Sequence, residues 1–443
     1  MKNIFYISIL LISFSIGTSF SQNFNKSKLD KLFDVLAEKN KAMGSIAISK
    51  NGKLLYSRAI GYSSISGNEK IPSTATTKYR IGSITKMFTS TMIFQLIEER
   101  KIKLTSTIDA YFPKLPNARK ITIGNLLNHR SGLHNFTDDP DYKSWMTQPK
   151  THDEMLAIIS KNPVDFQPNE KASYSNSNYI VLGYIIEKIT KQSYSEALNQ
   201  RIISKVGLTN TEVGGKTTLS KNESFSYQFS DTWKQEPETD MSIPGGAGAI
   251  ISTPTDLTKF IEALFAHKLI SEKSLAQMKT LKDGYGMGMF SFPFYAKQAL
   301  GHNGGIDGFT SIVGYFPEDN VAISYISNGQ VYPMNDIIIG ALSIYFGEVY
   351  DIPEFMTFAL KSEDLDKYLG VYSSTELPLK MTISKENNLL IAQATGQSSF
   401  PLEATAKDTF QFRQAGVVIE FTTEKNEFIL KQGGGSYVFT KDK

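Results

Sequence analysis

The first 346 residues combine two hydrophobic patterns, and each predicts a different kind of element. Apolar residues at helical spacing predict helices, whereas short apolar runs between turn residues predict strands. Helices are expected at about 29–38, 83–97, 153–160, 181–189, 255–265 and 334–346. Strands are expected at 45–49, 53–58, 310–316 and 321–327. Strands at both ends with helices between them predict an α/β fold, in which helices flank an antiparallel sheet and a separate helical lobe is present.

After Gly347 the pattern changes to short runs at regular spacing, separated by turn residues such as Gly396 and the three glycines at 433–435. The runs are 379–384, 389–394, 409–413, 417–422, 427–431 and 437–440. This pattern is typical of a small antiparallel β-barrel or sandwich. The expected organisation is one domain over 24–346, a linker over 347–363 and a C-terminal β domain over 364–443.

The N-terminus has the three parts of a secretory signal peptide. Lys2 precedes an apolar stretch over 4–16, and the small residues Ser19 and Ser21 follow it. A membrane anchor is the alternative, but the apolar run covers about 13 residues and a spanning helix needs roughly 20. We therefore expect a signal peptide over 1–21 with cleavage near Ser21, a periplasmic or secreted protein, and no membrane span in the mature chain.

Composition excludes several classes of function. The chain has no cysteine, which excludes disulfides and thiol catalysis. Its formal net charge of +3 gives no argument for a nucleic-acid partner. His129 and His134 lack carboxylates at a familiar metal-binding spacing, and the chain has no G-x-x-x-x-G-K phosphate loop, so neither a metal nor another cofactor is expected. His129 is interpreted as a turn and core residue.

Ser83 and Lys86 form the only Ser-x-x-Lys tetrad in the chain. Residues three apart on a helix share one face, so the lysine amine can reach the serine hydroxyl. Burial lowers the pKa of a lysine, and a neutral amine can accept the serine proton. The alternative is an ordinary helix start with Ser83 as N-cap and a solvated Lys86.

Two later segments add chemistry to this tetrad. Tyr174 and Asn176 belong to the only Tyr-x-Asn in the chain; a phenol can shuttle protons, and an amide can both donate to and accept from a substrate peptide group. The segment 301–305 reads Gly-His-Asn-Gly-Gly, and its glycines would let a substrate backbone lie against a strand edge.

These motifs, in this order, resemble the serine β-lactamases and penicillin-binding proteins, in the branch of class C β-lactamases, D-alanyl-D-alanine carboxypeptidases, D-aminopeptidases and related esterases. The resemblance implies Ser83 as the acylated nucleophile, Lys86 as its base partner and Tyr174 as a proton shuttle. It implies that Asn176 orients the substrate amide. The backbone N–H groups of Ser83 and Gly305 would form the oxyanion hole. Whether lysine or tyrosine is the acylation base stays open.

The third motif departs from class C β-lactamases, which have Lys-Thr-Gly where this chain has His302-Asn303-Gly304. A histidine there resembles the peptidase side of the family; it can bond to Tyr174 or offer positive charge to a carboxylate, depending on its protonation. The alternative is a structural His302. The C-terminal segment resembles a lipocalin-like domain appended to some members.

The expected function is therefore an exported serine hydrolase acting on bonds next to D-amino acids, like a D-alanyl-D-alanine carboxypeptidase or a D-aminopeptidase. A carboxylesterase or a β-lactamase with the same machinery is the enzymatic alternative. A penicillin-binding sensor is the non-enzymatic one. Expected substrates are small peptides, esters or β-lactams, with peptidoglycan as a possible larger partner.

Overall fold

The computed structural model describes residues 24–230, 232–355, 360–386, 389–397, 399–412 and 415–442. The predicted signal peptide over 1–21 lies outside them. Among the described residues, no helix is both long and apolar enough to cross a membrane.

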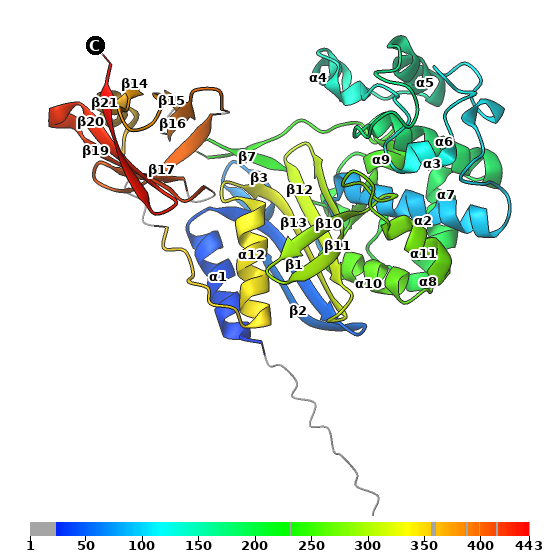
Figure 1. Ribbon diagram of the computed structural model, residues 1–443. Helices are drawn as coiled ribbons and strands as arrows, with labels where there is room; N and C mark the ends of the chain where they lie inside the picture. The colour runs from blue at the N-terminus through cyan, green and yellow to red at the C-terminus, as the bar shows by residue number, and fades with distance from the viewer. Residues whose placement is uncertain are drawn as a thin grey trace, which may run out of the picture.

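A six-stranded antiparallel sheet forms the centre of the molecule, with strand order β10-β11-β12-β13-β1-β2. Two helices, α1 (Lys26–Glu38) and α12 (Met334–Phe346), pack together on one face of this sheet, and α10 (Pro254–Phe265) packs against β1, β12 and β13 (Figure 1). The strands are β1 (Ala42–Lys50), β2 (Lys53–Ile60), β10 (Phe290–Phe294), β11 (Lys297–Ile306), β12 (Phe309–Phe316) and β13 (Val321–Gln330). The predicted sheet with flanking helices is confirmed.

The boundaries of these elements have local causes. Asn51 and Gly52 join β1 to β2 with φ values of 52° and 76°, the left-handed pair that a two-residue hairpin requires. Helix α10 begins with Pro254, and the Thr253 side chain accepts a hydrogen bond from the Asp256 N–H, which caps the first turn.

A helical lobe lies beside the sheet, on the right of Figure 1. Its central helix is α2 (Thr85–Glu98), in which every residue from Thr85 to Leu96 is buried. The other helices of the middle section are α3 (Ile123–Leu127), α4 (Tyr142–Trp145), α5 (His152–Lys161), α6 (Asn176–Thr190), α7 (Tyr194–Leu198), α8 (Ser204–Val206), α9 (Gly245–Gly248) and α11 (Glu272–Lys279). Because α2 is buried on all sides, it forms the core of the lobe.

Short strands outside the six-stranded sheet form three smaller sheets. They are β3 (Tyr62–Ser66), β4 (Glu69–Pro72), β5 (Tyr79–Arg80), β6 (Glu212–Val213), β7 (Tyr227–Phe229), β8 (Trp233–Gln235) and β9 (Ile250–Ser252). Strand β5 runs directly into the turn that carries Ser83, and it pairs with β9.

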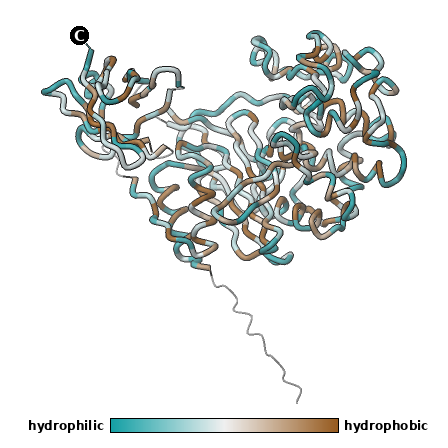
Figure 2. Tube along the Cα trace, in the orientation of Figure 1, coloured by the Kyte–Doolittle hydropathy of each residue, from teal (hydrophilic) through white to brown (hydrophobic). Residues whose placement is uncertain are grey.

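The C-terminal strands close into an eight-stranded barrel. They are β14 (Gly370–Ser373), β15 (Lys380–Glu386), β16 (Leu389–Ala394), β17 (Phe400–Ala406), β18 (Thr409–Phe412), β19 (Val417–Thr422), β20 (Glu427–Gln432) and β21 (Gly435–Lys441). Hydrophobic and hydrophilic residues alternate along these strands (Figure 2), and the apolar side chains fill the interior. The predicted all-β barrel is confirmed, whereas the domain boundaries 24–346, 347–363 and 364–443 stay predictions.

The barrel contacts the first part of the chain through a long-range ion pair. Lys41, which follows α1, donates to Glu403 of β17 at 2.9 Å. The Lys41 amine also lies 5.0 Å from the centre of the Phe355 ring.

Candidate active site

Ser83 lies in a short 3-10 turn, Gly82–Ile84, which leads straight into α2. This turn places Lys86 in the first turn of the helix, with its Nζ 2.9 Å from the Ser83 Oγ. The same amine is 2.8 Å from the Asn176 Oδ1 and 2.9 Å from the Ala247 carbonyl oxygen. The predicted adjacency of serine and lysine is present, with the serine on a 3-10 turn and not on the α-helix itself.

Lys86 has no exposed surface, and burial lowers the pKa of its amine well below the ordinary value. A neutral amine has two N–H donors and one lone pair. The two carbonyl-type oxygens of Asn176 and Ala247 can only accept, so they take the two hydrogens. The lone pair is left for the hydroxyl hydrogen of Ser83, which is the arrangement of a base and a nucleophile.

Tyr174 lies next to this pair. Its ring centre is 4.9 Å from the Lys86 Nζ, and its hydroxyl hydrogen-bonds with Ser83. Burial raises the pKa of the phenol, and the bond to Ser83 offsets part of that rise. Tyr174 is therefore a neutral phenol at pH 7, able to pass a proton to or from the serine oxygen.

His302 lies on β11 and is buried, which lowers its pKa to about 3. Its Nδ1 contacts the Asn303 carbonyl oxygen, which can only accept, so Nδ1 carries the hydrogen. Its Nε2 is then an acceptor, without a hydrogen-bond partner among the described residues. The ring centres of His302 and Tyr174 are 6.4 Å apart. Two roles of His302 were open from sequence: a bond to Tyr174, or a positive charge for a substrate carboxylate. The lowered pKa makes the ring neutral, so the structure does not support the second role.

Gly304 and Gly305 bring β11 against the turn of the nucleophile. A Cβ on Gly304 would lie 2.1 Å from the Ile81 carbonyl oxygen and 3.0 Å from the Ser83 nitrogen. A Cβ on Gly82 would lie 2.8 Å from the Gly305 nitrogen. These close approaches place the Ser83 and Gly305 N–H groups on adjoining segments, as an oxyanion hole requires.

The pairing of β10 with β11 ends at Gly301, so residues 302–306 have no partner from β10. This part of β11 therefore has no strand pairing on the β10 side, and substrate binding along it stays a prediction. Asn303 is exposed and does not line the cavity beside Ser83.

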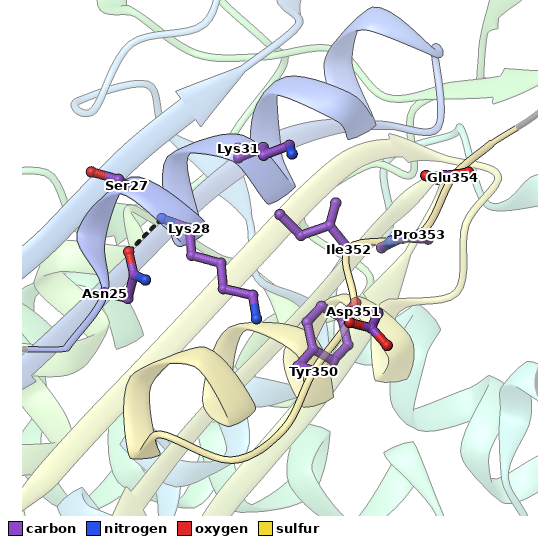
Figure 3. A pocket seen from close by; sticks show the side chains of 9 residues that line it. All are labelled: Asn25, Ser27, Lys28, Lys31, Tyr350, Asp351, Ile352, Pro353 and Glu354. Atoms are coloured by element: carbon purple, nitrogen blue, oxygen red, sulfur yellow. Dashed lines mark hydrogen bonds between the residues drawn. The ribbon is translucent and has the colours of Figure 1, made fainter.

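A cavity of about 370 Å³ opens at Ser83. It is lined by Gly82, Ser83, Phe136, Thr137, Tyr142, Lys143, Met146, Asn176, Glu236, Thr239, Pro244, Ala247, Gly248, Gly305, Ile306 and Asp307. A larger cavity of about 750 Å³ lies between the first turns of α1 and the segment after α12, where Lys28 and Lys31 face Asp351 and Glu354 (Figure 3). That cavity contains no nucleophile with a neighbouring base, so the chemistry belongs to the smaller one.

The model of the Beta-lactamase family matches residues 29–341. The chain belongs to this family. The predictions of a serine hydrolase and of a β-lactamase-like fold are thereby confirmed.

Three relatives in this family extend the comparison. Penicillin-binding protein 4* of Bacillus subtilis (strain 168) is 26% identical over 93% of this chain and 97% of its own length. Teichoic acid D-alanine hydrolase of Staphylococcus aureus is 31% identical over 61% of this chain and 67% of its own length. The crystal structure of D-amino acid amidase from Ochrobactrum anthropi SV3, complexed with D-phenylalanine, has a TM-score of 0.65 and 26% identity, covering 72% of this chain and 98% of that one.

Within this β-lactamase-like site, sequence reasoning missed the contribution of His129. Its ring stacks on Tyr174 with centres 4.4 Å apart. Its Nδ1 accepts from the Ser175 N–H and lies 3.3 Å from the Asn178 amide nitrogen, at the start of α6. The prediction of a buried turn residue is consistent with its 2% exposure and its φ of 57°. The sequence signal was the segment Leu126–Leu133, which resembles a recurrent family segment.

Asn176 is held by a second group that sequence reasoning missed. Its amide nitrogen donates to the Asn135 Oδ1 and to the Thr137 Oγ1, both at 3.2 Å. Since its oxygen accepts from Lys86, the amide is fixed at both ends. Both residues follow the histidines of the 129–134 segment, but no spacing rule connects them to Asn176.

Proposed function

We propose that this protein is an exported serine hydrolase that forms an acyl-enzyme on Ser83 and cleaves bonds next to D-amino acids. The observation that carries the proposal is the buried amine of Lys86, whose pKa burial lowers, placed 2.9 Å from the Ser83 Oγ. A serine hydroxyl is a weak nucleophile, and a base at hydrogen-bond distance activates it.

In the proposed reaction, the Ser83 oxygen attacks the substrate carbonyl carbon and its proton passes to Lys86. The carbonyl oxygen becomes an oxyanion, which accepts from the N–H groups of Ser83 and Gly305. The bond to the leaving group then breaks, and the leaving amine or alcohol takes a proton through Tyr174. Water attacks the ester carbon in the second half, giving a proton back to Ser83 and releasing the acid.

Three observations support a D-residue substrate. One relative is named as a D-amino acid amidase and its structure holds D-phenylalanine. Another is named for the hydrolysis of teichoic acid D-alanine, and a third as a penicillin-binding protein. The proposal includes export, which rests on the signal-peptide pattern over 1–21.

Hydrolysis of D-aminoacyl esters is the second candidate, and it rests on the relative named for teichoic acid D-alanine. The site does not separate the two, because an ester and an amide form the same acyl-enzyme on Ser83. The leaving group is what distinguishes them.

The test compares turnover of D- and L-alanyl p-nitroanilides with that of the matching methyl esters, using the mature chain and its Ser83→Ala variant. The proposal predicts hydrolysis of the D compounds by the natural chain and none by the variant. Turnover of esters alone would make the enzyme an esterase. Sustained hydrolysis of nitrocefin would make it a β-lactamase, and a stable penicillin adduct without turnover of any substrate would favour a sensor.

A further inference from the structure

The cavity at Ser83 is lined by more acidic than basic side chains. Its three charged side chains are Lys143, Glu236 and Asp307. Asp307 is almost fully buried, and one of its oxygens lies 2.9 Å from an Arg80 nitrogen. Its other oxygen accepts from the backbone and the hydroxyl of Thr239. Both oxygens of the Asp307 carboxylate therefore already have partners within the protein.

Glu236 differs, because among the described residues its carboxylate has no hydrogen-bond or ion-pair partner. The neighbouring Arg80 does not supply one, since it also pairs with Glu238 at 2.7 Å. One guanidinium thus faces the two carboxylates of Asp307 and Glu238. With Lys143 included, these charges balance, so Glu236 gives the group its net negative charge, which favours a cationic ligand group.

Glu236 packs beside the end of β11, and this location indicates which part of a bound substrate it contacts. A Cβ on Gly308 would lie 3.1 Å from the Glu236 Cγ, so Glu236 packs against the turn after β11. Gly308 lies in the two-residue turn after β11, beyond Gly305 and Ile306, and Glu236 lines the cavity together with these two residues. Tyr174 and His302, near which the leaving group departs, lie on the other side of Gly305. Glu236 therefore faces the acyl part of the substrate.

The segment carrying Glu236 is held in place by the sheet. The Glu236 N–H donates to the Ser226 carbonyl at 2.9 Å, and the Gly308 N–H donates to the Ser226 hydroxyl at 3.0 Å. The Tyr227 hydroxyl accepts from the Ile65 N–H at 2.7 Å. Because this backbone is already held by hydrogen bonds, little conformational entropy is lost when the Glu236 carboxylate binds a ligand.

We propose that Glu236 binds a primary ammonium group on the acyl part of the substrate, so that the preferred substrates are amides or esters whose acyl part has a free amine. This inference rests on the proposed function of the site. On the leaving-group side, burial lowers the pKa of both Lys86 and His302, which disfavours the positive charge that a terminal carboxylate would need. The arrangement favours an aminopeptidase or aminoacyl esterase over a carboxypeptidase.

Two sources of ammonium fit this chemistry: the α-amine of a D-aminoacyl group, and the side-chain amine of a lysyl residue one position further away. The test uses D-alanyl p-nitroanilide with its N-acetyl counterpart. A second pair is Nα-acetyl-L-lysyl-D-alanine p-nitroanilide with its Nε-acetylated counterpart. In each pair the scissile bond is the same and only the ammonium is removed. The pair that shows the larger preference identifies the source.

Glu236→Gln keeps the shape of the side chain and removes its charge. We expect it to lower kcat/KM for the preferred ammonium substrate by about 10- to 100-fold, the range of a charge-assisted hydrogen bond, and to leave the acetylated counterpart within about 2-fold. Glu348→Gln, the same change on an exposed residue just after α12, controls for net charge and is expected to have no effect.

Equal effects of Glu236→Gln on both members of each pair, or none on either, would overturn the role of Glu236. Labelling of Ser83 by a fluorescent penicillin separates this outcome from failure of the proposed function. A labelled, active enzyme with no ammonium preference refutes only the Glu236 proposal. Absence of both label and turnover refutes the proposed function and this proposal with it.

Discussion

The Nζ of Lys86 lies 2.9 Å from the Oγ of Ser83, and burial lowers the pKa of this amine well below its ordinary value. Two acceptor oxygens take its hydrogens and leave its lone pair for the serine. The relationship explains why a helix that is buried along most of its length contains a lysine in its first turn.

Replacing Lys86 with methionine is expected to slow acylation strongly while the fold is kept. Methionine retains most of the aliphatic stem but has no lone pair of comparable basicity. Loss of a positioned base lowers rates by about 10²- to 10⁴-fold. The labelling rate of Ser83 by a fluorescent penicillin, with circular dichroism to monitor folding, checks this. Unchanged labelling of a folded variant would remove Lys86 from the mechanism.

Asn176→Asp is expected to shift the activity to higher pH. The Asn176 oxygen accepts from the Lys86 amine at 2.8 Å, and a carboxylate there would stabilise the charged ammonium and raise the lysine pKa. More of the lysine would then be protonated at neutral pH, and the acid limb of the kcat/KM profile would move to higher pH. An unchanged limb with lower overall activity would indicate that Lys86 does not titrate in that limb.

Gly304→Ala and Gly305→Ala form a matched pair. The Cβ of the first would lie 2.1 Å from the Ile81 oxygen and 2.5 Å from the Ser311 hydroxyl, whereas the second would meet no atom closer than 3.9 Å. We expect the first to push β11 away from the Ser83 turn and to lower kcat by about 10²- to 10³-fold, as loss of an oxyanion donor does. For Gly305→Ala we expect a kcat within about 3-fold of that of the natural chain, because the added Cβ has no close neighbour. Equal effects in steady-state kinetics would contradict this geometry.

His302 is expected to make the protein less stable in acid. Its pKa is about 3 when folded and 6.5 in the reference state, so between these values the unfolded chain binds a proton that the folded chain does not. Stability is fully present above about pH 6.5 and falls as the pH drops toward 3, by about 1.4 kcal/mol per unit for one proton. Urea unfolding of His302→Gln at several pH values should show a slope reduced by that amount. His129, whose pKa is also lowered, retains its own contribution in the variant and serves as the internal comparison. An unchanged slope would mean that His302 is charged in the folded state.

The parts of this structure that sequence predicted depend on short-range geometry. The spacing of Ser83 and Lys86 brings them together in one helical turn, and Asn51-Gly52 specifies a hairpin by its backbone angles alone. Helix α12 and strands β16 and β19 were predicted with the bounds that the structure has. In each of these, the hydrophobic pattern and the turn residues agree.

The parts that sequence missed are determined by distant residues. Strand β11 contains three glycines, at 301, 304 and 305, which is a poor strand composition, and its pairing is supplied by β12. Strand β17 contains Pro401, which argues against a strand, yet it pairs with β16. His129 and Glu236 reach the site only through tertiary packing, which no local pattern contains.

The central claim is that Ser83 is the nucleophile, and the most direct measurement is the intact mass of the mature protein after incubation with a fluorescent penicillin, followed by peptide mapping. The account predicts one covalent adduct, located on the peptide that contains Ser83, and no adduct in Ser83→Ala. An adduct that maps to another residue, or one that persists in Ser83→Ala, would contradict it.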